Sequence, residues 1–102
     1  MRLAASNLAA AQNVALYTVP ALKRAVLSVS LCNRTNGPIK VRLALADGAA
    51  PEDSDWIEFD TQISAGGVLE RTGLALGAGQ SVFVRADVAG LSAVAFGIEE
   101  SI

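Results

Sequence analysis

The sequence contains no histidine, and this absence removes several kinds of catalytic site at once. Without an imidazole there is no Ser-His or Cys-His pair in which a base activates the nucleophile. Metal sites that depend on histidine ligands are excluded as well. Carboxylates are therefore the main candidates for acid-base chemistry or for binding a hard cation.

Cysteine and aromatic residues are also scarce. The single cysteine, Cys32, has no partner for an intramolecular disulfide, so nothing in the sequence implies an oxidising compartment. Cys32 lies at the end of an apolar run with only Arg34 nearby, which favours a packed thiol over a reactive one. One Trp, one Tyr and three Phe offer no cluster that predicts a sugar platform.

Charged residues make up 18% of the 102 residues, below the usual value of about 25%. The net charge is -2 and the eight Lys and Arg residues are scattered, so the sequence predicts no nucleic-acid partner. No apolar run approaches the roughly 18 residues of a membrane span, and the N-terminal residues lack the apolar core of a signal peptide. We expect a single domain that is made in a cytoplasm and has no membrane partner.

Alternation of apolar and polar residues predicts β-strands. In residues 25–32 the odd positions are apolar, and residues 39–46 repeat the pattern with Lys40 and Arg42 on the wetter face. Asn36-Gly37 between them is a turn signal and predicts a hairpin with a wide loop. Seven strands are predicted in all, at residues 14–19, 25–32, 39–46, 56–63, 68–76, 81–86 and 91–99.

Seven short strands separated by turn signals predict an antiparallel, jelly-roll-like β-sandwich over residues 14–102. Residues 1–13 show no strand pattern, and a turn capped by Ser6 over residues 7–12 is too short for a stable helix. We interpret residues 1–13 as an N-terminal arm that lies on a neighbouring subunit, with a mobile end as the alternative.

The last predicted strand has two unequal faces. Val94, Phe96 and Ile98 lie on one face. Ala93, Ala95 and Gly97 leave the other face almost without side chains. We expect this smooth face to pack closely against another backbone or subunit.

The loop at residues 47–55 is the one candidate ion site, because hard cations take several oxygen ligands. Its carboxylates are Asp47, Glu52, Asp53 and Asp55. They lack the spacing of an EF-hand loop, which favours a solvated loop over a calcium site.

Carboxylates on the predicted strands are the candidates for a two-carboxylate glycosidase site. Glu58 with either Glu70 or Asp60 could in principle form such a pair. Their strand positions favour surface charges instead. We expect Glu58 and Asp60 to face Lys40 and Arg42 across a strand pair, with each contact contributing about 0.2–1 kcal/mol.

The turn Gly77-Ala78-Gly79 does not predict a dinucleotide site, because it leads into a strand and not into the helix that such a site requires. The residue pattern therefore predicts no catalytic, cofactor-binding or metal-binding residues. We expect a protein without enzymatic activity and without a cofactor.

Six stretches of the sequence resemble small β-sandwich structural proteins of tailed bacteriophage particles. They are Tyr17–Pro20, Cys32–Arg34, Val41–Leu45, Trp56–Asp60, Gly67–Gly73 and Gly77–Arg85. Here they have the sequences YTVP, CNR, VRLAL, WIEFD, GVLERTG and GAGQSVFVR, and the resemblance extends over residues 14–99. Leu22 departs from the family, which often has glycine at this position.

The resemblance implies a virion structural protein that forms a homo-oligomer, expected to be a trimer. As a head decoration or cement protein it would bind the major capsid protein, whereas as a tail, baseplate or fibre component it would bind tail proteins. A third alternative is a receptor- or glycan-binding module, for which Trp56 and Tyr17 are the plausible aromatic contacts.

Overall fold

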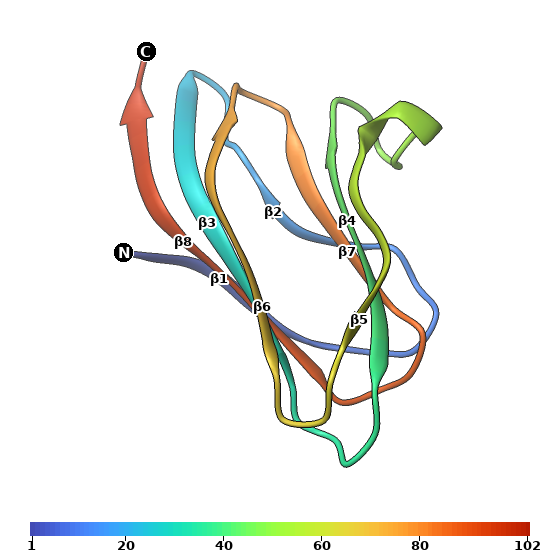
Figure 1. Cartoon of the computed structure of the whole chain (residues 1–102). Helices are drawn as coiled ribbons and strands as arrows, with labels where there is room; N and C mark the ends of the chain where they lie inside the picture. Colours follow the sequence, from blue (N-terminus) through green and yellow to red (C-terminus); the bar gives the residue numbers. More distant parts are fainter.

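A computed structural model describes residues 1–102 and shows an all-β protein, as predicted, with two four-stranded antiparallel sheets (Figure 1). The strands are β1 (Arg2–Leu8), β2 (Val14–Thr18), β3 (Lys23–Asn33), β4 (Ile39–Ala46), β5 (Trp56–Ile63), β6 (Val68–Leu76), β7 (Ser81–Ala86) and β8 (Leu91–Ser101). Sheet A has the order β1-β8-β3-β6, and sheet B has the order β2-β7-β4-β5. A single 3-10 turn, Asp53–Asp55, precedes β5, and no helix is long and apolar enough to cross a bilayer.

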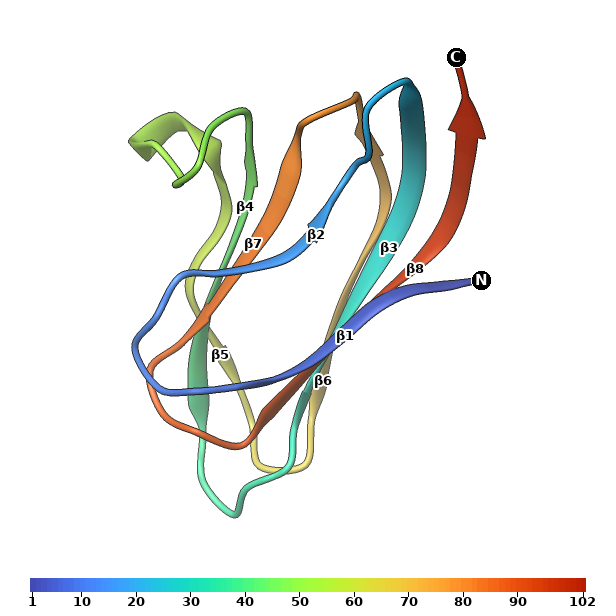
Figure 2. The same ribbon diagram turned by 180° about the vertical axis from the view of Figure 1, so that it is seen from behind.

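The strand pairs are nested along the chain. The innermost pair is β4 with β5, followed by β3 with β6, β2 with β7 and finally β1 with β8. Two further pairs, β3 with β8 and β4 with β7, complete the sheets. Apart from the β4–β5 connection, every connection crosses from one sheet to the other, as Figures 1 and 2 show from opposite sides.

Alternating apolar residues of the two sheets meet in one core. Leu27 and Leu31 of β3 enter it from sheet A, and Val41 and Leu43 of β4 enter it from sheet B, each at most 2% exposed. Full burial of such a side chain contributes about 1.5–3 kcal/mol. The faces predicted from the period-two pattern of β3 and β4 are confirmed.

Asn33 at the end of β3 is completely buried and polar. Its side chain hydrogen-bonds to the loop at residues 34–38 and to the end of β5 and the turn that follows it. A buried amide satisfied in this way fixes the relative positions of segments that would otherwise expose unpaired carbonyl groups. Asn33 thus joins the β3–β4 and β5–β6 connections at one end of the molecule.

The expectation that residues 1–13 form an arm without a strand is wrong for residues 2–8. β1 pairs antiparallel with β8, and Leu8 is 2% exposed within the core. The centre of β1 consists of Ala4, Ala5 and Ser6, and its register shifts between Arg2 and Ala4, so the sequence shows no clear period-two pattern. The chain therefore has eight strands where seven were predicted.

The alanine-glycine face of β8, expected to pack against another backbone or subunit, lies inside the molecule and close to the backbone of β3. Ala93 and Ala95 are completely buried, and a Cβ atom added to Gly97 would lie 2.2 Å from the Val26 carbonyl oxygen. These small residues lie beside the larger core residues of β3, which fill the space between the sheets. Val94, Phe96 and Ile98 point outwards instead, whereas Leu91 at the start of β8 lies in the core.

Candidate functional site

The outer face of sheet B carries a group of charged and aromatic side chains. Lys40 and Arg42 lie on β4, and Arg85 is the β7 residue paired with Arg42. They point away from the core because their chain neighbours belong to it. Trp56 and Phe59 on β5 complete the group.

Arg42 is held between a carboxylate and an aromatic ring. Its Nε and Nη2 atoms donate to the two carboxylate oxygens of Asp60 at 2.7 and 3.2 Å, and its guanidinium carbon lies 3.9 Å from the Phe59 ring centroid. The hydrogen bonds from Arg42 lower the pKa of Asp60, and the same bonds raise the pKa of Arg42. The predicted Arg42–Asp60 cross-strand contact is confirmed.

An irregular backbone in β5 makes this contact possible. Asp60 has φ 55°, in the left-handed region, and the register between β4 and β5 shifts on both sides of Leu43. Bulges of this kind re-aim side chains at sheet edges. Phe59, which lies between Glu58 and Asp60 in the sequence, is 57% exposed.

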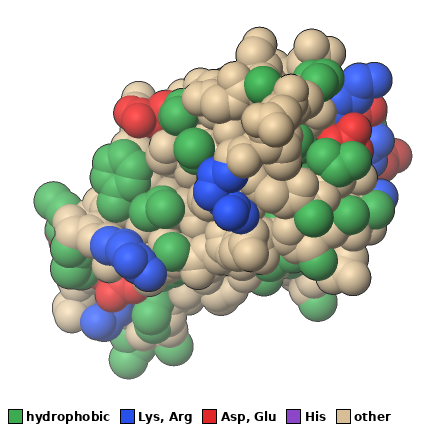
Figure 3. Space-filling view, turned by 90° about the horizontal axis from the view of Figure 1, so that it is seen from below, with side chains coloured by type: hydrophobic (Ala, Val, Ile, Leu, Met, Phe, Trp, Pro, Cys, Tyr) green, Lys and Arg blue, Asp and Glu red, His purple; other side chains and the backbone are tan.

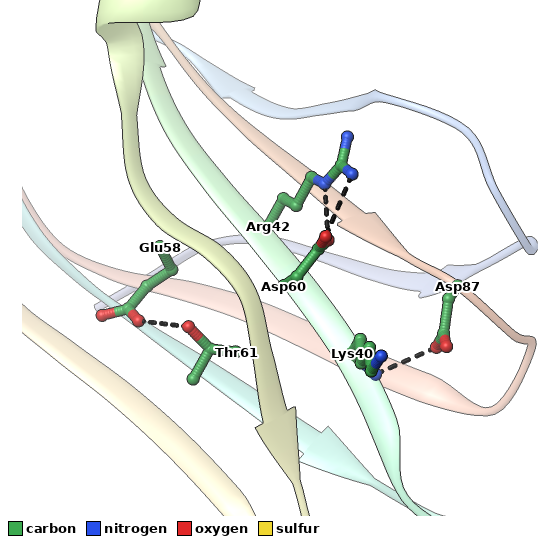
Figure 4. A network of polar contacts seen from close by, with 6 residues as sticks. All are labelled: Lys40, Arg42, Glu58, Asp60, Thr61 and Asp87. Carbon is green, nitrogen blue, oxygen red and sulfur yellow. Dashed lines mark hydrogen bonds and ion pairs between the residues drawn. The ribbon is translucent and has the colours of Figure 1, made fainter.

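Arg42 also lines a shallow hollow of about 230 Å³ on this face. The hollow is lined by Ala11, Lys40, Arg42, Asp60, Arg85 and Asp87. Asp87 accepts a hydrogen bond from the backbone N–H of Lys40 at 2.9 Å (Figure 4). Neither the Lys40 ammonium nor the Arg85 guanidinium forms an ion pair. The hollow therefore contains two cations without a partner.

Glu58 does not face Lys40 or Arg42, so this part of the cross-strand expectation is wrong. It lies across the β5 ribbon from Asp60 and accepts a hydrogen bond from the Thr61 hydroxyl at 2.7 Å (Figure 4). It also pairs with Arg71 of β6. The hydrogen bond from Thr61, together with Arg71, lowers the pKa of Glu58. This contact ties the edge strands of the two sheets together.

The carboxylates considered as a glycosidase pair, which the sequence favoured as surface charges, do not form one group. Glu58 and Asp60 point to opposite sides of β5, and Glu70 pairs with Ser30 in sheet A. In the acidic loop, Glu52 and Asp55 form a capping box around the 3-10 turn. No group of three or more acidic or cysteine residues is arranged to hold a metal ion.

The two aromatic residues expected to contact glycans have different environments. Tyr17 is buried and its hydroxyl donates to Glu99, so burial and this hydrogen bond raise the pKa of Tyr17. Trp56 is partly buried against Phe83 and meets Phe59 edge-on with ring centroids 5.8 Å apart. Phe59, which the sequence did not single out, is the exposed aromatic residue of this face.

The outer face of sheet A carries a row of exposed apolar side chains next to the serines of β3. Val26 and Ile98 are direct neighbours on β3 and β8, with 55% and 62% of their surfaces exposed. Phe96 and Val94 continue the row along β8 and are partly exposed. Figure 3 shows hydrophobic side chains along its left border, the side on which sheet A lies in Figure 1.

Glu70 of β6 is exposed beside Ser30 on this face, and a charged pair lies at one end of it. Arg24 and Glu100 form an ion pair there at 3.3 Å. Beside them Val26 and Ala75 help to line a hollow of about 270 Å³. Cys32 lies further along β3 on the same face and is partly buried.

Comparison with known proteins provides no relative. The chain matches no protein-family model, no curated protein and no solved structure. Two features of the molecule remain as pointers to function: the exposed apolar row on sheet A and the charged face of sheet B. The sequence resemblance is the third.

Proposed function

We propose that this chain is a non-enzymatic structural protein of a tailed-bacteriophage particle and that it self-associates through the outer face of sheet A. The six stretches that resemble phage structural proteins support the first part. The observation that carries the second part is the exposed apolar row that contains Val26, Ile98 and Phe96.

A row of exposed apolar side chains is unusual on the outer face of an antiparallel sheet. Such sheets normally bury one face and present polar residues on the other. Contiguous apolar patches on a monomer commonly mark an interface. Val26 and Ile98 each keep more than half of their surface exposed, so covering them would contribute about 1 kcal/mol each.

The proposed occupant of the face is a further copy of the same chain. Arg24 and Glu100 have opposite charges and lie side by side at the end of the face, so two copies can present a cation to an anion when they meet. The expected oligomer is a trimer, in which three copies of the face gather around one axis. The second partner is a particle protein, with the major capsid protein preferred and a tail, baseplate or fibre protein as the alternative.

We also propose that the two sheets form a β-sandwich of the jelly-roll type. The support is the combination of eight strands, two four-stranded sheets and four nested pairs. Jelly rolls occur in viral capsid domains and in lectins, so the architecture is compatible with the proposed role without selecting it.

Oligomeric state tests the proposed interface directly. Light scattering coupled to size exclusion should give a trimer mass for the unaltered chain and a monomer mass for Ile98→Asp. Val88→Asp is the matched control, because Val88 is an exposed apolar residue outside the strands of sheet A. A folded chain that is monomeric at all concentrations would refute the proposed self-association.

Location in the particle is a separate question with a separate experiment. Gold-labelled antibody against the chain, applied to purified particles, should label the head. Label confined to the tail would select the alternative location. Particles that contain the chain nowhere would refute the virion role even if the trimer forms.

A further inference from the structure

We propose that the hollow on the outer face of sheet B binds a sugar that carries a carboxylate, such as a uronic acid. This site lies on the sheet opposite to the proposed self-association face. It does not depend on that interface, so both can operate in the same molecule.

The first argument is charge. Lys40, Arg42 and Arg85 line the hollow together with only two carboxylates, and two of the three cations have no ion-pair partner. An arginine fork binds a planar carboxylate through two parallel hydrogen bonds, and a lysine adds a point charge beside it. The Arg85 guanidinium and the Lys40 ammonium, which form no ion pair within the chain, are the groups of the hollow left to bind a ligand carboxylate.

The second argument is the presence of hydrogen-bond acceptors in the same hollow. Asp87 uses one oxygen for the Lys40 backbone N–H, and Asp60 is bound by Arg42. Carboxylates accept several hydrogen bonds each, so both retain capacity for hydroxyl donors. A ligand with one carboxylate and several hydroxyl groups can pair its carboxylate with the cations and donate its hydroxyl groups to the two aspartates. A phosphodiester chain has negative charge but few donors to offer the two aspartates.

The third argument is the aromatic surface at the rim. Arg42 lines the hollow and stacks against the Phe59 ring, which places Phe59 beside the hollow. Phe59 remains 57% exposed, and aromatic surface of this kind packs against the apolar C–H side of a sugar ring. An acidic peptide would satisfy the cations equally well and would have no specific use for this ring.

Size and rigidity limit the ligand further. The volume of about 230 Å³ is below the roughly 300–1,000 Å³ of sites for drug-sized ligands, so it corresponds to a single monosaccharide unit. Arg42 is already fixed by Asp60 and Phe59 before any ligand arrives. Such preorganisation reduces the entropy lost on binding.

The test is an NMR titration of the ¹⁵N-labelled chain with three probes. Glucuronate should shift the backbone amides of Lys40, Arg85 and Asp87 in a saturable manner. Glucose tests the sugar ring without the carboxylate, and acetate tests the carboxylate without the ring. Each should bind at least tenfold more weakly than glucuronate.

Two variants and a control assign the effect to the hollow. Lys40→Gln and Arg85→Gln should each weaken glucuronate binding about tenfold, while their spectra remain dispersed. Arg24→Gln removes the same charge from sheet A and should leave the affinity unchanged. Equal affinity for acetate and glucuronate would overturn the sugar proposal in favour of a simple anion site. Absence of saturable shifts with glucuronate, or equal loss with Arg24→Gln, would overturn the site itself.

Discussion

Replacing Asn33 by alanine should destabilise the fold by about 3 kcal/mol. The Asn33 amide group donates to the carbonyl oxygens of Gly37 at 2.8 Å, Ile63 at 3.0 Å and Ser64 at 3.2 Å. Its Oδ1 atom accepts from the backbone N–H and the hydroxyl of Thr35 at 2.9 and 2.7 Å. The amide group has only two hydrogens for its three acceptors, so we count two donated and two accepted bonds. At about 1 kcal/mol net each, these four bonds contribute about 4 kcal/mol. Water that reaches the partly buried carbonyls in the variant lowers the expected loss to about 3 kcal/mol.

Urea unfolding followed by the fluorescence of Trp56, the single tryptophan, measures this loss. With a slope of about 1–3 kcal/mol per molar, the midpoint for Asn33→Ala should fall by roughly 1–3 M. Asn36→Ala is the control, because Asn36 is exposed in the same loop. Asn33→Asp should lose at least as much stability at neutral pH, because its acceptor oxygens would face three carbonyls. A midpoint for Asn33→Ala equal to that of the control would refute the role assigned to Asn33.

Three further predictions use the same unfolding assay. Gly97→Ala should lose at least about 2 kcal/mol, because its Cβ would overlap the β3 backbone, whereas Gly37→Ala has free space and should lose less than about 1 kcal/mol. Leu8→Ala should lose about 2–5 kcal/mol and the exposed Leu22→Ala less than about 0.5 kcal/mol, since Leu8 is a core residue of β1 and not part of an arm. Because the pKa of Tyr17 is raised in the fold, the unfolded chain loses this proton first, so stability should fall as the pH rises above about 10. Tyr17→Phe should remove that dependence, and absorbance at 295 nm should show no tyrosinate in the folded protein at pH 11.

The sequence predicted the middle of the fold better than its ends. In β3 and β4 large apolar residues alternate with serine, lysine and arginine, so the buried face is unambiguous. β1 has mostly small side chains, which fit a strand without indicating a face. In β8 the smooth face was expected to meet another backbone or subunit; it lies inside, close to the β3 backbone at Gly97, because β3 supplies the bulk beside it. The burial of the small β8 residues thus depends on the large side chains of β3, a strand that is distant in the sequence.

The charged hollow was only partly predictable. The Arg42–Asp60 contact follows from the pairing of two adjacent strands. The exposure of Phe59 depends on a bulge that the alternation does not reveal. Arg85 joins the site only through the register between β4 and β7, which are separated by two other strands. Residues that come from β4, β5 and β7 do not form a recognisable spacing in the sequence.

Because the strand pairs are nested, the chain can fold from its middle outwards. Once β4 and β5 have paired, β3 and β6 are separated only by short connections, and each later pair closes a similarly short loop. The entropy of closing a loop rises with its length, so this order avoids the cost of joining distant ends directly. The hydrogen bonds between Met1 and Gly97 would form at the final step. We expect β1 to dock last and open first, and amide hydrogen exchange should show the weakest strand protection there.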